Sequence, residues 1–269
     1  MYSNDKIIQA IPNLNKFLNA NNVDSVVLSK SLKVISGFKE SINVNMLDGK
    51  IIKENMILKM LKYISYAMKV ELSELDITIL VNDSKAENLK CILNLAEKVK
   101  TLKLVTNNED KFKTLEEKLQ EIMGILIRVT NNKRKGLAKE GIIINIDFSE
   151  EQLNKYTINP NAIIVNIQNN VRIKTKRFNG ITVNDIKLGV PLNYKMKFAK
   201  ANIYYDFEEK ELYESSIYYM DFEVAQKKIA KDNIYIEALI GNNGPINTKE
   251  FEEKCKFCVK TIDKNNILN

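Results

Sequence analysis

The sequence predicts an α/β fold with a doubly wound, mostly parallel sheet, and three observations support this prediction. Short apolar runs, rich in isoleucine, leucine and valine, alternate with amphipathic segments of helical period between residues 76 and 166. The runs are apolar on both faces, as is typical of parallel strands covered on both sides. Short turns join them, which favours right-handed β-α-β crossovers.

The first part of the chain predicts a smaller N-terminal α/β unit, residues 1–70. Residues 25–29 and 41–46 are short strand candidates, and Asp48-Gly49 is a turn signal. A helix is expected from about residue 53 to residue 69, because apolar residues recur there every three or four positions. Its apolar stripe is expected to pack on the next domain, while its lysines face water, namely Lys53, Lys59, Lys62 and Lys69.

The predicted central domain, residues 71–200, contains the parallel sheet. Five strands are expected, at residues 77–81, 102–106, 125–129, 141–146 and 162–166. Helices are expected after the first strand and from about residue 109 to residue 123, where Gly124 ends the second one. A short helix is expected between the third and fourth strands.

The predicted C-terminal segment, residues 201–269, is mainly helical and packs back on the N-terminal unit. An extended arm is expected at residues 202–207 and a long helix from about residue 211 to residue 231. A final helix is expected to begin near Thr248 and to run to residue 259.

The chain contains no histidine, and this narrows the possible chemistry. It excludes Ser-His-Asp and Cys-His catalysis and histidine-ligated metals, so no metal site is expected. Of the three cysteines, Cys255 and Cys258 have C-x-x-C spacing but lie inside an expected helix, where ordinary half-buried thiols are favoured. No apolar run approaches membrane-spanning length and no secretory signal is visible, so no membrane role and a cytoplasmic location are expected.

The formal net charge of +7 raises the question of a nucleic-acid partner. Eight basic residues and one acid lie between residues 172 and 200, and seven acids and one lysine lie between residues 206 and 223. The two segments could pair with each other, and no nucleic-acid-binding signature is present. Abundant lysine and asparagine are typical of an AT-rich genome, and nucleic acid is therefore not the favoured partner of this basic protein.

Residues 101–170, from Thr-Leu-Lys-Leu-Val-Thr to Asn-Ile-Gln-Asn-Asn, carry a family resemblance. The succession of polar-ended strands and helices resembles the nicotinamide-binding Rossmann-type domains of shikimate dehydrogenases, glutamyl-tRNA reductases and acyl-carrier-protein reductases. The resemblance covers roughly residues 70–225 and implies a Rossmann-like fold that binds NAD(P). It also implies that residues 177–183 lead out of the domain and that residues 213–220 begin a helix returning to the N-terminal unit.

The resemblance implies a set of cofactor-binding positions at the ends of the strands. They are Asn82, Asp83 and Ser84 after the first strand, Thr106 and Asn107 after the second, and Asn145 in the fourth. In this chain the first turn, residues 81–87, contains no glycine, whereas dinucleotide-binding loops carry Gly-x-Gly-x-x-Gly. Asp83 or Ser84 is expected to cap the following helix rather than to contact a phosphate.

Other departures concern catalysis. The family's threonine after the asparagine of the fourth strand is replaced by Ile146 and Asp147, and no acid or arginine for the adenosine ribose follows the second strand. No cysteine precedes Cys91, so the nucleophile of glutamyl-tRNA reductases is missing. Lys50 is the one candidate for the lysine of shikimate dehydrogenases.

The sequence therefore predicts a Rossmann-like pseudoenzyme with a degenerate NAD(P)-binding loop, no catalytic residues and no bound cofactor, which serves in binding, regulation or assembly. Its partner would be an unknown protein or small-molecule ligand, and whether it forms a homo-oligomer stays open. One alternative is an active NAD(P)-dependent oxidoreductase with an unconventional loop and Lys or Asp as acid-base. Another is a nucleic-acid-binding protein that uses the basic segment 172–200.

Overall fold

A computed structural model of the chain describes residues 4–123, 127–200 and 206–254. The chain divides into two compact units. Unit 1 consists of Met1–Ile52 and Leu188–Tyr235, and unit 2 of Lys53–Lys187 and Ile236–Asn269.

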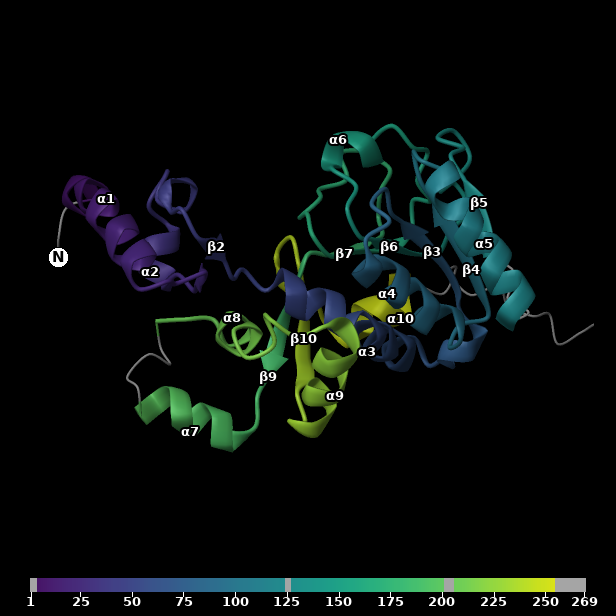
Figure 1. The fold of residues 1–269 in the computed structure, drawn as a ribbon. Helices are drawn as coiled ribbons and strands as arrows, with labels where there is room; N and C mark the ends of the chain where they lie inside the picture. The colour runs from purple at the N-terminus through teal and green to yellow at the C-terminus, as the bar shows by residue number, and fades with distance from the viewer. Residues whose placement is uncertain (1–3, 124–126, 201–205, 255–269) are drawn as a thin grey trace, which may run out of the picture. The chain divides into compact units, whose positions relative to one another are not determined.

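Unit 2 contains a six-stranded sheet in the order β5-β4-β3-β6-β7-β8, and all five pairings are parallel (Figure 1). Numbered along the chain, this is the order 3-2-1-4-5-6. It is the strand order of the Rossmann fold. The predicted fold class is thus confirmed, with the strands at Asp76–Leu80 (β3), Thr101–Val105 (β4), Ile127–Thr130 (β5), Ile142–Asn145 (β6), Ile163–Asn166 (β7) and Ile181–Val183 (β8).

The sixth strand, β8, corrects one expectation. Residues 177–183 were expected to lead out of the domain, but Ile181–Val183 pairs in parallel with β7 at the edge of the same sheet. The three residues Ile-Thr-Val are all buried, because β-branched side chains pack well on a pleated surface.

The sheet has two halves, β3 to β5 and β6 to β8, and the connections within each half cover one face of the sheet. Helices α4 (Ala86–Ala96) and α5 (Asp110–Met123) belong to the first half, and right-handed crossovers place them on the same face. The other face carries a buried cluster to which Leu80, Ile143 and Ile164 of the sheet contribute. It is covered by the connections of the second half, which include the short helix α6 (Glu150–Leu153) and residues such as Phe148 and Val171.

The short helix expected between the third and fourth strands is absent from the described residues 131–141. Asn132 closes a turn there: its Oδ1 accepts a hydrogen bond of 3.0 Å from the Lys135 N–H, and its backbone oxygen accepts one of 2.7 Å from the Gly136 N–H. Such side-chain bonds favour turns over helices.

Helix α3 (Lys50–Met68) precedes the sheet and is followed by the 3-10 helix η2 (Leu72–Glu74). Met56, Met60 and Ile64 of the apolar stripe of α3 are fully buried. The expectation that Lys53 faces water was wrong, since Lys53 is 5% exposed and its Nζ donates a hydrogen bond of 3.1 Å to the backbone oxygen of Asn184.

The N-terminal part of unit 1 packs around helix α1 (Asn4–Ala20), which the sequence reading had not predicted. Ile11 and Leu18 of α1 share a buried cluster with Leu28 and Phe38. The two predicted strands form a short parallel pair, β1 (Ser25–Val26) with β2 (Asn45–Met46). Between them lie α2 (Lys30–Lys33) and the 3-10 helix η1 (Lys39–Ser41).

The remaining part of unit 1 contains α7 (Leu192–Lys200), α8 (Glu209–Glu214) and α9 (Phe222–Lys231). The single long helix expected at residues 211–231 was therefore wrong. The Asp221 carboxylate accepts a hydrogen bond of 3.1 Å from the Val224 N–H and starts a new helix. Most of the arm expected at residues 202–207 lies outside the described residues.

A three-stranded sheet, β11-β10-β9, was not predicted. Its strands are Asp185–Gly189 (β9), Tyr235–Gly241 (β10) and Gly244–Pro245 (β11), and β10 and β11 form an antiparallel hairpin. The last described helix, α10 (Thr248–Lys254), begins where the sequence predicted, and Cys255 and Cys258 lie outside the described residues. Within the described part of the chain, no helix is both long and apolar enough to cross a membrane.

Candidate functional site

The candidate site of unit 2 lies where β3 and β6 end side by side. The strand order reverses between these two strands, and ligands of open α/β sheets bind in the crevice beyond the carboxyl ends at such a point. The loop from Val81 to Lys85 connects β3 to α4 and occupies the position of a dinucleotide-binding loop.

The Asp147 carboxylate is bonded to the backbone of this loop. Its Oδ1 and Oδ2 accept hydrogen bonds of 2.8 and 2.9 Å from the Asn82 N–H, and its Oδ2 accepts one of 2.7 Å from the Asp83 N–H. Burial raises the pKa of Asp147, and the two backbone N–H donors oppose this rise. A carboxylate of the chain itself therefore takes the hydrogen bonds that a glycine-rich loop offers to a phosphate.

Asn82 ties the loop after β3 to the loop after β4. Its side-chain oxygen accepts hydrogen bonds from Asn107, of 2.9 Å from the backbone N–H and 3.1 Å from Nδ2. The Asn108 Nδ2 donates a bond of 3.3 Å to the backbone oxygen of Asn82. Thr106 is fully buried, and its Oγ1 accepts a bond of 3.0 Å from the Asn108 N–H. The predicted residues Asn82 and Asn107 thus bind each other, and Thr106 bonds to the neighbouring Asn108.

The expected helix cap at Asp83 or Ser84 was wrong. The first turn of α4 follows Lys85, and no side chain caps it. The Asp83 carboxylate instead lies 2.7 Å from the Lys85 Nζ, and this hydrogen bond lowers the pKa of Asp83. The helix begins one residue later than a cap at Ser84 would place it. The side chain of the buried Asn88 donates a hydrogen bond of 2.8 Å to the backbone oxygen of Asp83 and so stabilises the loop.

Asn145 is fully buried at the end of β6 and does not face an open crevice. Its Nδ2 donates hydrogen bonds of 3.0 Å to the Phe148 oxygen and 2.9 Å to the Asn166 Oδ1, and its Oδ1 accepts one of 2.9 Å from the Phe148 N–H. All the hydrogen-bonding capacity needed at this buried site is met inside the protein.

Asn145 is the first member of a chain of side-chain amides along the carboxyl edge of the sheet. Asn166 Nδ2 donates a bond of 2.8 Å to Asn184 Oδ1, and Asn184 Nδ2 donates one of 2.7 Å to Asn242 Oδ1. The sequence reading missed this chain, although a signal was present: the segments Ile-Ile-Ile-Asn145, Ile-Ile-Val-Asn166 and Ile-Thr-Val-Asn184 all end in asparagine. We call Asn145, Asn166, Asn184 and Asn242 the asparagine chain.

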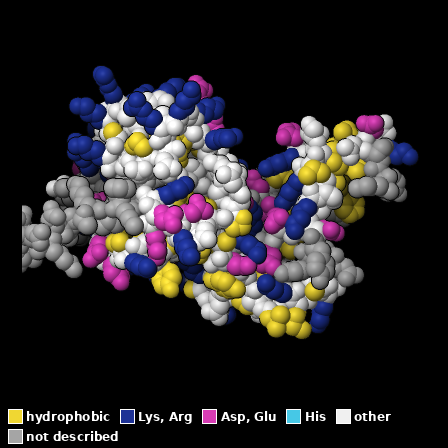
Figure 2. All heavy atoms as spheres, turned by 180° about the vertical axis from the view of Figure 1, so that it is seen from behind, with side chains coloured by type: hydrophobic (Ala, Val, Ile, Leu, Met, Phe, Trp, Pro, Cys, Tyr) yellow, Lys and Arg dark blue, Asp and Glu magenta, His cyan; other side chains and the backbone are white. Residues whose placement is uncertain are grey.

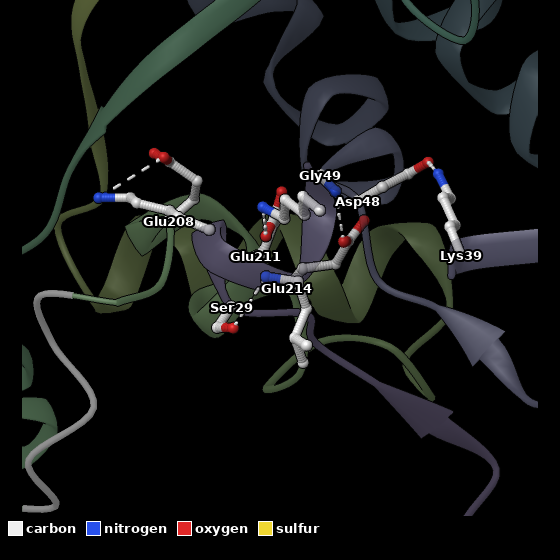
Figure 3. A network of polar contacts seen from close by, with 10 residues as sticks. Ser29, Lys39, Asp48, Gly49, Glu208, Glu211 and Glu214 are labelled. Carbon is white, nitrogen blue, oxygen red and sulfur yellow. Dashed lines mark hydrogen bonds and ion pairs between the residues drawn. The ribbon is translucent and has the colours of Figure 1, made fainter. Parts of the chain in front are cut away.

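A second internal carboxylate binds backbone amides, here within unit 1. Glu214 reaches from α8 to the start of α3, where Gly49 and Ile51 donate hydrogen bonds of 2.6 and 2.7 Å to it (Figure 3). Glu211, one turn earlier, forms an ion pair with Lys33. Lys50, the candidate for the family's lysine, lies 3.1 Å from the Asp48 carboxylate with its side chain about half exposed.

Many charges of the basic segment 172–200 are paired within their own units. Lys174 lies 2.7 Å from Glu150, Lys187 lies 2.7 Å from Glu237, and Lys195 lies 3.6 Å from Glu209. Figure 2 shows Lys and Arg side chains gathered over the part of unit 2 that contains α6 and the end of β5. The described residues contain no cluster of three or more Cys, Asp or Glu that could hold a metal ion.

No family model matches the chain, and no curated protein matches it. Among solved structures, L-tryptophan dehydrogenase from Nostoc punctiforme is 11% identical over 95% of this chain and 65% of that chain, with a TM-score of 0.38. A shikimate dehydrogenase in complex with NADP+ is 12% identical over 77% of this chain and 61% of that chain, with a TM-score of 0.34. A chorismate mutase/shikimate 5-dehydrogenase fusion protein from Clostridium acetobutylicum is 17% identical over 85% of each chain, with a TM-score of 0.28.

The chain spans less than two thirds of the length of the first two structures. The assignment to the Rossmann fold rests on the strand order and the parallel pairing of the six strands.

Proposed function

We propose that this chain is a non-catalytic Rossmann-fold protein that binds a partner or ligand without holding a dinucleotide at the usual loop. The observation that carries the proposal is the position of the Asp147 carboxylate, which accepts hydrogen bonds from the Asn82 and Asp83 N–H groups. These are the loop amides that a pyrophosphate would need.

The residues of the loop do not suit a pyrophosphate. Asp83 and Asp147 both place negative charge at the loop, and the cation Lys85 is paired with Asp83 at 2.7 Å. An incoming pyrophosphate would have to displace Asp147 and leave a half-buried carboxylate without its backbone donors. Such a displacement costs more than the bonds gained, because one anion merely replaces another.

The neighbouring positions support the same proposal. The ribose of a dinucleotide is normally read by an acid after the second strand of the sheet, whereas Thr106 is fully buried and bonded to Asn108. Asn145 is bonded on all sides by Phe148 and Asn166. The polar groups along this edge are therefore satisfied by one another, which favours a structural use of the edge.

Calorimetric titration of NADH and NADPH into the full chain tests the proposal. We expect no saturable binding of either compound at about 1 mM, where even a weak site of −4 kcal/mol would be half filled. Binding of either one with micromolar affinity would overturn the proposal and favour an active oxidoreductase with an unconventional loop. The matched variant Asp147→Asn keeps an oxygen acceptor and removes the charge, so inorganic pyrophosphate should bind this variant more tightly than the unaltered protein.

A further inference from the structure

A half-open cavity of about 320 Å3 lies in unit 2, away from the loop after β3. One wall is the edge strand β8 with the segment that precedes it, a second is the β10–β11 hairpin, and a third is α10. The volume is at the lower end of the range for small-molecule sites. The asparagine chain ends at this cavity, because Asn242 lines it.

The charge of the cavity wall is positive. Arg172, Lys254 and Glu250 line it, and Lys254 lies 3.8 Å from the Glu250 carboxylate. Within the described part of the chain the Arg172 guanidinium has no carboxylate within ion-pair distance. Glu150, which accepts a hydrogen bond of 3.1 Å from the Arg172 backbone N–H, is paired through its other oxygen with Lys174 at 2.7 Å. One guanidinium thus remains available to an anion.

The backbone of β8 adds polar groups to the same wall. The Ile181 N–H donates a hydrogen bond of 3.0 Å to the Ala162 oxygen of the neighbouring segment. Because successive residues of a strand point their backbone groups to opposite sides, the N–H and C=O of Thr182 point away from β7, toward β10, where the Thr182 oxygen lies beside Gly241. Thr182 and three glycines, Gly180, Gly241 and Gly244, line the cavity.

Apolar side chains complete the lining. Phe178 and Ile246 face the cavity from the segment before β8 and from the end of the hairpin. A ligand for this site would therefore combine an anionic group with a short apolar or polar body, as small organic acids and phosphate esters do.

We propose that this cavity is a binding site for a small anion, in which Arg172 binds the carboxylate or phosphate oxygens of the ligand and Thr182 and the hairpin bind the rest. The site is separate from the loop held by Asp147. It can therefore be present whether or not a dinucleotide binds, and its test does not depend on NADH or NADPH.

Two probes distinguish the sources of the anionic group. Succinate, observed by saturation-transfer difference NMR, represents carboxylates, and inorganic phosphate, observed by 31P line broadening, represents phosphates. We expect saturable binding of at least one probe to the full chain with a dissociation constant of about 1 to 10 mM, as suits ligands of so few atoms.

The variants Arg172→Gln and Arg177→Gln form a matched pair. Both arginines are exposed and lie in the same segment, but only Arg172 lines the cavity. Arg172→Gln should lower the affinity for the bound probe at least about tenfold, the loss expected for one charge-assisted hydrogen bond. Arg177→Gln should leave the affinity for the probe unchanged. Circular dichroism checks that both variants fold.

Two results would overturn the proposal. One is the absence of saturable binding of both succinate and phosphate up to about 50 mM, which would be weaker than any specific site for such anions. The other is equal weakening by Arg172→Gln and Arg177→Gln, which would mean that the probes respond to the general positive charge of the surface.

Discussion

The carboxylate of Glu214 accepts a hydrogen bond of 2.6 Å from the backbone N–H of Gly49, the residue immediately before α3. Glu214 is 1% exposed, and the Ile51 N–H donates a second bond of 2.7 Å to it. The first amides of a helix have no partner inside the helix, and the Glu214 side chain supplies the acceptors for two amides at this end. The start of α3 is therefore stabilised by Glu214, which lies more than 160 positions later in the chain.

Glu214 should make the stability of the protein depend on pH. Burial raises the pKa of Glu214 above its ordinary value of 4.5, against the opposing effect of the backbone donors. The folded state then holds the proton to higher pH than the unfolded state. The stabilising contribution of the protonated group is complete below pH 4.5 and is lost as the pH rises through the raised pKa.

Glu214→Gln should remove this dependence. As the pH rises from 4.5 through the raised pKa of Glu214, the free energy of unfolding of the unaltered protein should fall relative to that of the variant. Urea unfolding at several pH values measures the difference. Glu40→Gln, at an exposed position of the same unit, should give a curve parallel to that of the unaltered protein; a parallel curve for Glu214→Gln would contradict the prediction.

Removing the Asp147 carboxylate should destabilise unit 2. Asp147→Ala leaves the Asn82 and Asp83 N–H groups without their acceptor, and the expected loss is about 1 to 3 kcal/mol in the free energy of unfolding. Glu151→Ala removes a carboxylate whose side chain is 86% exposed and should change little. Chemical denaturation of both variants checks the prediction, which fails if the two changes are equal.

The hydroxyl of Tyr213 should contribute to holding α7, α8 and α9 together. It donates a hydrogen bond of 2.9 Å to Asp232 Oδ2, which also accepts bonds of 2.6 Å from Tyr194 and 2.8 Å from Lys228. Burial raises the pKa of Tyr213, so the phenol stays a donor at all ordinary pH values.

Tyr213→Phe keeps the ring and removes only this donor. The free energy of unfolding should fall by about 1 to 3 kcal/mol, as for other buried bonds to a charged acceptor. Tyr219→Phe removes a hydroxyl from an exposed ring that donates to Asp24 at 3.2 Å and should leave stability unchanged. Thermal or urea unfolding of the two variants distinguishes them, and an unchanged Tyr213→Phe protein would refute the role of the hydroxyl.

A substitution at the centre of the asparagine chain should lower the stability of the protein. Asn166→Ala removes a buried side chain that links Asn145 to Asn184 and should cost about 2 to 3 kcal/mol, from one unmet donor, one weakened acceptor and a small cavity. Asn170→Ala, four residues later and exposed, should have no measurable effect on urea unfolding. Equal stability of the two variants would mean that the chain of amides does not stabilise the edge.

Local sequence was sufficient for the strands of the sheet. The runs around Ile79, Leu104 and Ile144 are apolar on both faces, so only a covered parallel strand suits them. The sixth strand was missed because Ile181–Val183 is too short to have a clear period of its own, and it becomes a strand by pairing with β7. The single helix predicted at residues 211–231 was wrong because the chain breaks at residues 215–221 and a new helix starts at the Asp221 cap.

The ends of the strands were predicted from the sequence, but the contacts of the residues there were not. Asn82, Thr106, Asn107 and Asn145 were identified at the ends of the right strands, because strand ends can be read from the pattern. Which group accepts the Asn82 N–H could not be read in this way: Asp147 lies 65 positions away in sequence and reaches the loop only because β3 and β6 pair.

The sequence by itself predicted the doubly wound α/β fold class with five of the six strands, and it showed that the loop after the first strand has no glycine and that no histidine is available for catalysis. The tertiary structure alone decided that the loop amides are bonded to Asp147, that Lys53 is buried beside Asn184 and that Glu214 begins α3. The physical reason is the same in each case. Periodicity and composition report the burial of local segments, whereas a buried polar group is satisfied by whichever distant residue the fold brings within hydrogen-bonding distance.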